Sequence, residues 1–395
     1  MSAPAAPAAP GLSPVATAAA TAAAKSGKEP EVNKLFRMVM KYEGSDLHLK
    51  VGLPPMMRLA GTIRATELPQ LSATDMERLL LSILSERQTR ILEDTGGIDF
   101  AHIIGDDECR FRVNLFRQRG RLSLVARRVN TKIPDFKALF LPPIIEELCK
   151  FYQGLVILAG VTGSGKSTTI AAMLEYINQH ERVHILTIED PIEFMFRDKK
   201  AIINQREVGI DVSDWHIALK HAVREDPDII LVGEMRDRET FEAAMHAAET
   251  GHLVFGTIHA SSAPSTVGRI LDLFPPDMHG AIRQNLAFNL KAVVAQKLLP
   301  TTKEMTEKGT KRVPTCEILI QNPTIRKLIS EKQDEKLGDA IRMFIQEGMQ
   351  DYTESLRVLV TSEYIERSTA FEAAPNVDAL KMALKGIKVS TPGIL

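Results

Sequence analysis

LVILAGVTGSGKSTTIAAMLEYI, residues 155–177, is the stretch of sequence that decides the fold. A short apolar run ends at Ala159, a glycine-rich turn follows, and a helical pattern begins at Lys166. The turn, residues 160–167, matches the pattern GxxxxGK[ST] in full and lies between a strand and a helix, as that pattern requires. The sequence therefore predicts a phosphate-binding loop that opens a helix.

The predicted loop has the chemistry to bind a nucleoside triphosphate. Its glycines allow backbone N–H groups to turn inward around a phosphate, and the helix N-terminus adds the positive end of its dipole. Lys166 is expected to pair with the β- and γ-phosphates, and the Ser167 hydroxyl is expected to ligate Mg²⁺. The predicted nucleotide-binding residues are Gly160, Thr162, Gly163, Ser164, Gly165, Lys166, Ser167 and Thr168.

Further apolar runs predict a parallel sheet around this loop. They are VHILTI at 183–188, IILV at 229–232 and LVFGTI at 253–258, and amphipathic stretches separate them. Continuous apolar strands of this kind are typical of parallel sheets that are covered on both faces. The sequence therefore predicts an α/β core.

Acidic and histidine residues follow these strands directly. Glu193 comes shortly after the first run, Glu234 after the second and His259 after the third, and His252 precedes the third. Because ligands bind at the carboxyl ends of parallel strands, we expect residues at these ends to converge on the phosphate loop. Glu234 is the predicted catalytic carboxylate, which would align or deprotonate the water that attacks a nucleoside triphosphate. Either histidine could donate to a γ-phosphate or to that carboxylate, although a lone histidine is more often a core or surface residue.

Seven arginines stand in the nineteen residues 110–128. One hypothesis is that some of them are arginine fingers, which reach a nucleotide across a domain or subunit interface. A second is that they form a solvated basic sheet face. A third, a nucleic-acid stripe, is disfavoured because few aromatic residues lie nearby for base stacking.

Changes in composition along the chain predict its organisation. We expect a disordered Ala/Pro-rich tail, an α+β domain, a proline-rich linker, the α/β core that carries the phosphate loop and a helical C-terminal region. The predicted boundaries are 1–30, 31–133, 134–143, 144–322 and 323–395, in that order.

The overall composition excludes several classes of protein. The net charge is -1, which disfavours a protein that holds nucleic acid by bulk electrostatics. The three cysteines form no CxxC pair, so they supply no disulfide framework and no four-cysteine zinc site. No run of about 18 apolar residues is free of charge, so no transmembrane helix is predicted.

Six motifs together make the sequence recognisable. They are GVTGSGKSTT from Gly160, TIEDPIEF from Thr187, DPDIILVGEMRDRET from Asp226, AAETGHLVFGTIHA from Ala247, SDLHL from Ser45 and RFRVNLF from Arg110. In this order and spacing they resemble the secretion-ATPase superfamily, and more closely the type IV pilus retraction (twitching motility) ATPases of the PilT and PilU type.

The resemblance implies a RecA-like P-loop core, an N-terminal PAS-like domain and a homohexamer that binds ATP and Mg²⁺. It assigns Glu234 as the catalytic glutamate and Glu193 as a second glutamate that assists the metal and the water. His252 and His259 mark the family's histidine box. The implied arginine fingers are Arg112, Arg119 and Arg127.

The resemblance also implies a setting for the protein. Such an ATPase is cytoplasmic and peripheral to the inner membrane, acts on an inner-membrane platform protein of the pilus, and works beside a paralogous motor ATPase in some systems. No nucleic-acid partner is expected. Three alternatives remain open: PilT versus PilU type, an ATP-binding accessory subunit with little hydrolysis, and a pilus-assembly or type II secretion ATPase.

Overall fold

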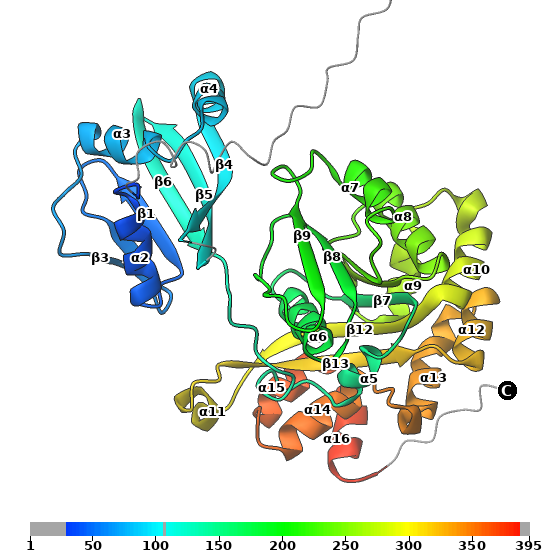
Figure 1. The fold of residues 1–395 in the computed structure, drawn as a ribbon. Coiled ribbons are helices and arrows are strands. Elements are labelled where there is room, and N and C mark those ends of the chain that lie inside the picture. Colours follow the sequence, from blue (N-terminus) through cyan, green and yellow to red (C-terminus); the bar gives the residue numbers. More distant parts are fainter. Residues whose placement is uncertain (1–28, 106–107, 388–395) are drawn as a thin grey trace, which may run out of the picture. The chain divides into compact units, whose positions relative to one another are not determined.

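The computed structural model describes residues 29–105 and 108–387, which form two compact units. Unit 1 ends at Asn130 and unit 2 begins at Thr131. The predicted Ala/Pro-rich tail lies outside the described residues, except for its last two positions. Figure 1 shows both units as ribbons.

Unit 1 is an antiparallel sheet, and helices pack their apolar side chains against one face of it. Its six strands are ordered β3-β2-β1-β6-β5-β4. Alternate residues on these strands are buried, among them Leu47 and Leu49 on β1, and they join Phe36 of the first helix and Met76 of the next in one apolar cluster. The elements are α2 (Asn33–Lys41), β1 (Asp46–Lys50), β2 (Met56–Leu59), β3 (Thr62–Ala65), α3 (Ala73–Leu81), α4 (Glu86–Thr95), β4 (Gly97–Ile104), β5 (Cys109–Gln118) and β6 (Arg121–Arg128).

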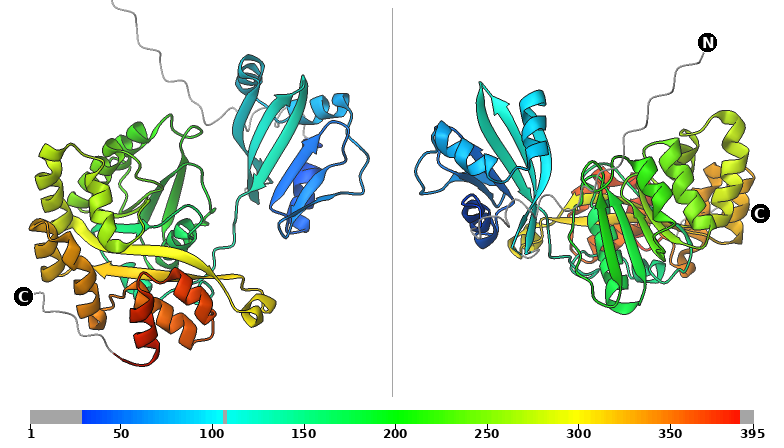
Figure 2. Two further views of the ribbon diagram at one scale, coloured as in Figure 1. Left: turned by 180° about the vertical axis from the view of Figure 1, so that it is seen from behind. Right: turned by 45° about the horizontal axis from the view of Figure 1, so that its top comes forward.

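Unit 2 is built on a seven-stranded sheet in the order β13-β12-β7-β11-β10-β8-β9. All neighbouring pairs are parallel except β12 with β13. The strands are β7 (Gly154–Ala159), β8 (His184–Glu189), β9 (Ile202–Glu207), β10 (Ile229–Val232), β11 (Leu253–Ile258), β12 (Leu290–Pro300) and β13 (Arg312–Ile320). Every residue of β7, β10 and β11 is buried, because helices cover both faces of the sheet (Figure 2).

The helices divide between the two faces of this sheet. One face packs against α5 (Ile144–Leu148) and α6 (Lys166–His180). The other packs against a larger set that includes α7 to α10, α12 and α13. These are α7 (Trp215–Ala222), α8 (Arg238–Glu249), α9 (Ala263–Leu271), α10 (His279–Asn289), α12 (Pro323–Ser330) and α13 (Leu337–Met343).

The C-terminal region is helical, as predicted. After the short α11 (Lys303–Glu307) between β12 and β13, helices α14 (Tyr352–Thr361), α15 (Arg367–Ala373) and α16 (Val377–Leu384) share a small core with Leu299 and Val313. Short 3₁₀ turns lie at Pro276–Met278, Asp334–Lys336 and Ile345–Glu347. The predicted α/β class, with a RecA-like core and a helical C-terminal region, is confirmed.

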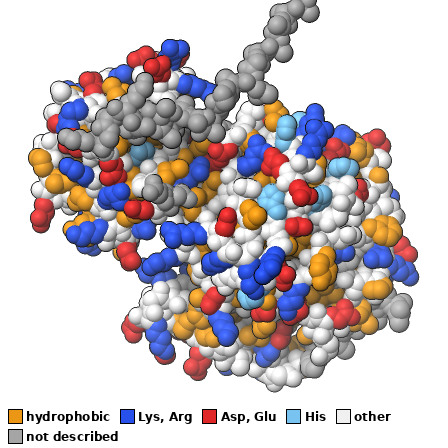
Figure 3. Space-filling model, in the orientation of Figure 1, with side chains coloured by type: hydrophobic (Ala, Val, Ile, Leu, Met, Phe, Trp, Pro, Cys, Tyr) orange, Lys and Arg blue, Asp and Glu red, His pale blue; other side chains and the backbone are white. Residues whose placement is uncertain are grey.

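The segment 134–143, predicted as a linker, packs in part on unit 2. Leu141 is buried there, and Phe136 and Leu139 pack on the α5–α6 side of the sheet. Its apolar side chains explain this packing, which its prolines alone do not predict. Basic and acidic side chains are interspersed over the visible face of unit 2 (Figure 3), in keeping with the near-neutral net charge. Among the described residues, none of the helices combines the length and apolar character that crossing a bilayer requires.

His102 makes the stability of unit 1 depend on pH. Its ring packs 4.8 Å from that of Phe36, and its Nε2 atom lies 2.7 Å from Oδ1 of Asn33. Burial lowers the pKa of His102 to about 4. Between its ordinary pKa of about 6.5 and this value, the unfolded chain binds a proton that the folded chain does not. Its stability contribution is therefore complete above pH 6.5 and is lost as the pH falls toward 4.

We therefore predict that the free energy of unfolding of unit 1, measured by urea denaturation, falls on the order of 3 kcal/mol as the pH is lowered from 6.5 to 4. In His102→Gln this fall should be much smaller, because the titrating group is gone. His221→Gln, at an exposed position of α7, is the control and should behave as the wild type. An equal pH dependence in His102→Gln would contradict the prediction.

Candidate functional site

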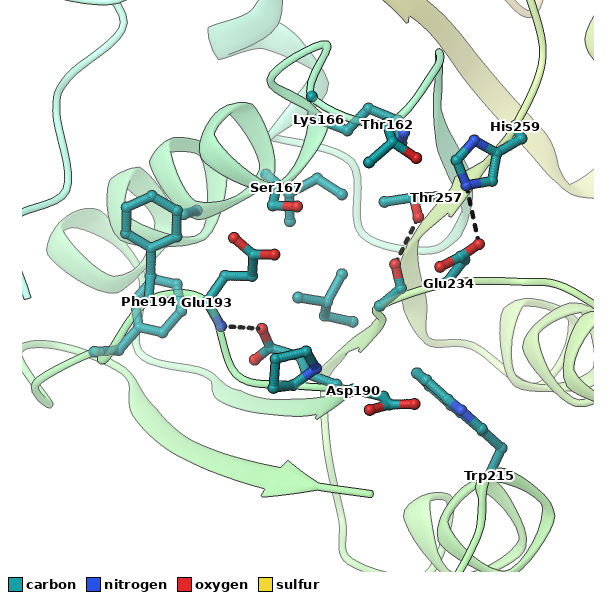
Figure 4. Close-up of a pocket in the computed structure, with 18 residues that line it drawn as sticks. Thr162, Lys166, Ser167, Asp190, Glu193, Phe194, Trp215, Glu234, Thr257 and His259 are labelled. Atoms are coloured by element: carbon teal, nitrogen blue, oxygen red, sulfur yellow. Dashed lines mark hydrogen bonds and ion pairs between the residues drawn. The ribbon is translucent and has the colours of Figure 1, made fainter. Parts of the chain in front are cut away.

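A pocket of about 180 Å³ lies in unit 2 at the carboxyl ends of the central strands. The phosphate loop forms one wall, and the segments that follow β8, β10 and β11 form the others (Figure 4). The strand order places β7, β11, β10 and β8 side by side, so their carboxyl ends meet at one edge. The polar lining residues are Thr162, Lys166, Ser167, Glu189, Asp190, Glu193, Trp215, Glu234, Thr257 and His259.

The phosphate loop has a backbone that glycine alone adopts easily. Gly160, Gly163 and Gly165 have φ angles of 152°, 78° and 92°. A Cβ atom on Gly160 would lie 2.5 Å from the Gln296 carbonyl oxygen, and one on Gly165 would lie 2.7 Å from Gln296 Nε2. Gln296, on β12, donates to the Ser164 carbonyl at 2.9 Å, so the neighbouring strand fixes the loop from behind.

Lys166 is folded back onto the phosphate loop. Its Nζ atom donates to the carbonyl oxygens of Gly160 and Val161, at 2.7 and 3.1 Å. Burial lowers the pKa of Lys166, and the charge of Glu234 opposes that effect. The buried Ser164 hydroxyl has no hydrogen-bond partner among the described residues. The loop therefore holds a cation and an unsatisfied polar group, as a site for an anion does.

Glu234 follows β10 and is held between two cationic or polar partners. Its Oε2 atom accepts from Arg236 at 2.7 Å, and its Oε1 atom lies 3.0 Å from His259 Nε2. Burial by itself would raise the pKa of Glu234, but Arg236 and His259 together hold it below its ordinary value. The Glu234 carboxylate is therefore ionised at neutral pH and faces the pocket (Figure 4).

The end of β8 supplies two more carboxylates in different environments. Glu189 is buried and accepts hydrogen bonds from the Thr187 hydroxyl at 2.7 Å and from the backbone N–H of Glu193 at 3.4 Å. Burial raises the pKa of Glu189 to about 7. The Glu193 carboxylate and the Ser167 hydroxyl both face the pocket (Figure 4). These two oxygen groups are the type of ligand that Mg²⁺ prefers.

The segment after His259 is anchored to the C-terminal part of unit 2. The backbone N–H of Ala263 donates to Glu317 Oε2 at 2.7 Å, and the Tyr352 hydroxyl donates to the Ser261 carbonyl at 3.3 Å. Glu317 lies on β13 and Tyr352 begins α14. The position of His259 therefore depends on residues that come about 60 to 90 positions later in the chain.

Known proteins similar to this chain show the family to which it belongs. The family model described as Type II/IV secretion system protein matches residues 22–376. The chain belongs to this family. It is 41% identical over 344 residues to the type IV pilus retraction ATPase PilT of Pseudomonas aeruginosa, an alignment that covers 87% of this chain and 98% of that protein.

A second relative and a solved structure are similar to nearly the whole chain. The type IV pilus ATPase PilU of Pseudomonas aeruginosa is 37% identical over 355 residues, which is 90% of this chain and 91% of that protein. A crystal structure of the pilus retraction motor PilT with bound ADP superposes with a TM-score of 0.80 at 42% identity, and the match covers 89% of this chain and 99% of that one. The predicted resemblance to PilT and PilU is thus confirmed.

The structure brings most of the predicted core residues to the pocket. Thr162, Gly163, Lys166, Ser167, Glu193, Glu234 and His259 line it. Gly165 and Thr168 line a second hollow, together with Leu139, Phe140 and Leu298. His252 does not line the pocket, because it precedes β11 whereas His259 follows it, and its Nδ1 atom lies 2.9 Å from the Ala247 carbonyl oxygen.

The predicted arginine fingers all lie in unit 1. Arg112 on β5 is directly opposite Arg127 on β6, and Arg119 lies in the turn between these strands with a φ of 51°. Three residues of the site were not predicted from the sequence: Trp215 and Thr257, which line the pocket, and Arg236, which binds Glu234. Thr257 carried a weak signal in the sequence, as the single polar residue of an apolar run. Trp215 carried none, because it opens α7 and does not directly follow a strand in the sequence.

Trp215 offers a direct report on the pocket, because it is the chain's single tryptophan and lines the pocket wall. We predict that ADP changes its fluorescence in a saturable way, since a ligand there alters the polarity around the indole. Lys166→Ala should keep the emission of the free protein and weaken the ADP response. Lys308→Ala, at an exposed position after α11, is the matched control with an unchanged response. An emission indifferent to ADP in the wild type would contradict the prediction.

Proposed function

We propose that this chain is an ATPase motor that couples ATP hydrolysis to the retraction of type IV pili. One observation carries the proposal: the Glu234–His259 pair lies across one pocket from a complete phosphate loop, in a chain that matches nearly the full length of a pilus retraction ATPase. The pilus assignment comes from the relatives, and the pocket supports the hydrolysis.

The phosphate loop would bind the β- and γ-phosphates, with Lys166 leaving the loop carbonyls to pair with them. The Ser167 hydroxyl and the Glu193 carboxylate would hold Mg²⁺, because both present oxygen ligands to the same pocket. When bound, that ion supplies neutralisation of the phosphate charge.

Glu234 would orient the attacking water and take up its proton. A carboxylate that stays ionised can accept a proton, and its pKa is kept low by Arg236 and His259. His259, whose Nε2 atom lies 3.0 Å from Glu234 Oε1, would donate to the γ-phosphate as charge develops on it.

The hollow lined by Gly165 and Thr168 would take the nucleobase. Leu139, Phe140 and Leu298 give it apolar walls that suit a flat ring. Arg112, Arg119 and Arg127 would complete the site as arginine fingers within a homohexamer. His252 lies at the opposite end of β11 from His259 and would have its role outside the pocket.

The setting proposed here is the one that the family resemblance implies. A retraction motor would work in the cytoplasm at the inner membrane, on a platform protein of the pilus. A second function, an accessory motor of the PilU type that acts beside a paralogous ATPase, is favoured by the match over 91% of PilU. Both functions require the same nucleotide chemistry.

Glu234→Gln tests the hydrolytic role. The amide keeps the shape of the side chain but cannot accept a proton, so we expect the rate of phosphate release to fall roughly 10²–10³-fold. ADP binding, followed by Trp215 fluorescence, should change little. Glu242→Gln, which removes an exposed carboxylate paired with Arg238 on α8, is the control and should hydrolyse ATP normally. Full turnover in Glu234→Gln would reassign the base.

Deleting the gene tests the direction of the motor. A retraction motor removes pili from the surface, so the deletion strain should carry excess pili and lose twitching, as electron microscopy and motility assays would show. Complementation with the Lys166→Ala variant should fail, and complementation with Glu242→Gln should succeed. A loss of surface pili would instead indicate an assembly ATPase. Excess pili appearing only when a paralogous ATPase is also deleted would indicate the accessory motor.

A further inference from the structure

A row of charged side chains crosses the face of the unit 1 sheet that is opposite its apolar core. Asp46 on β1 is directly opposite Arg58 on β2 and Arg127 on β6, and Arg127 is directly opposite Arg112 on β5. Residues that pair directly across strands point to the same face of a sheet. The neighbouring positions, such as Leu47 and Ala126, point to the other face and lie in the core.

Asp46 is the centre of this row. Its side chain is only 4% exposed, and each of its two oxygens contacts a different arginine. Arg127 donates from Nε to Oδ1 at 2.9 Å, and Arg58 Nε lies 3.4 Å from Oδ2. The Ser45 hydroxyl donates to Oδ2 at 2.7 Å. Burial opposes ionisation of Asp46, but these partners keep its pKa below the ordinary value.

The two arginines are held differently. Arg58 is also fixed through Nη1, which donates to the Gly61 carbonyl at 2.9 Å. Arg127 is bound to Asp46 only through Nε, and within residues 29–105 and 108–387 its two terminal Nη groups have no other ion-pair or hydrogen-bond partner. Its side chain is 75% exposed. The guanidinium of Arg127 is therefore oriented on one edge and open at its forked end.

The charges in the row do not cancel. One carboxylate faces two guanidiniums, and Arg58 is sufficient to neutralise it, so the charge of Arg127 is left over for a ligand. Arg112 adds a second positive charge beside it. Two other titratable groups lie on this side of β1, His48 and Lys50. His48 contributes little charge, because burial lowers its pKa, whereas the exposed Lys50 adds a further positive side chain. An arginine held by Nε with free Nη groups is arranged to bind two oxygens of a phosphate at once.

We propose that Asp46 is a positioning residue that aims the forked end of Arg127 at the outer phosphates of the bound nucleotide, with Arg58 as the counter-ion that keeps Arg127 positive. This inference rests on the proposed function, because it takes the phosphates of ATP as the ligand of Arg127. It distinguishes Arg127 from Arg112 and Arg119, which have no such clamp among the described residues, and it adds Arg58 and Asp46 to the functional set.

A purely structural role for Asp46 makes a different prediction. If Asp46 only satisfied buried charge within the sheet, its loss would lower stability but leave each folded molecule fully active. If it positions Arg127, folded molecules turn over slowly, and the two residues act as one unit. Residues that act as a unit give non-additive effects in a double-mutant cycle.

The experiment compares Asp46→Asn, Arg127→Ala and the double variant in the full-length protein. We expect kcat for phosphate release to fall about 10- to 100-fold in Asp46→Asn, because a small misplacement of a phosphate-binding group has that cost. In Asp46→Asn, KM for ATP should change less than kcat, and the Trp215 response to ADP should persist. The double variant should be no slower than Arg127→Ala. Asp99→Asn is the matched control, since Asp99 lies on the same sheet face and accepts from Asn114 at 3.2 Å.

The outcomes separate the inference from the proposed function. Normal kcat in Asp46→Asn beside a slow Arg127→Ala would overturn the positioning role alone, as would additive losses in the double variant. Normal kcat in Arg127→Ala would overturn both the positioning role and the finger role of Arg127. A wild-type protein without ATPase activity would overturn the proposed function itself. If Asp46→Asn fails to fold, Asp46→Glu keeps the charge but displaces the carboxylate, and wild-type kcat in that variant would overturn the inference.

Discussion

The close approach of the phosphate loop to Gln296 is the constraint on which the rest of unit 2 depends. The loop touches β12 at two places where a side chain would collide, so Gly160 and Gly165 are required by packing as well as by their backbone angles. Gln296 also accepts from the Thr169 hydroxyl at 2.9 Å and thereby links the first turn of α6 to the same strand. The sheet order that puts β12 beside β7 is thus a condition for a loop that can surround a phosphate.

A second consequence of the sheet is that it sorts the carboxylates of the pocket by environment. Glu189 ends its strand inside the protein, where burial dominates and raises its pKa to about 7. Glu234 lies just beyond its strand, where Arg236 and His259 outweigh burial. Carboxylates in one site whose pKa values are pushed apart take different roles. The ionised Glu234 is suited to accept a proton, whereas Glu189 is suited to hold the backbone that carries Glu193.

The sequence predicted the features that depend on short segments. The phosphate loop, the apolar strands and the polar residues after them are local patterns, and strand topology brings Glu193, Glu234 and His259 together as expected. Features that depend on pairing between distant segments were not predictable in this way. The contact between Asp46 and Arg127 joins residues 81 positions apart and requires the register of β1 on β6. His252 and His259 lie at opposite ends of one strand, as the sequence indicated, and His259 reaches the pocket whereas His252 does not.

The anchoring of the segment after His259 links β13 and α14 to the pocket wall. Glu317 and Tyr352 hold that segment by two hydrogen bonds, although neither lines the pocket. The region from β13 to α14 therefore cannot be exchanged between relatives without affecting the segment that follows His259. A hybrid protein would need to inherit β13 and the start of α14 from the same parent as the histidine segment, because the two regions share one set of contacts.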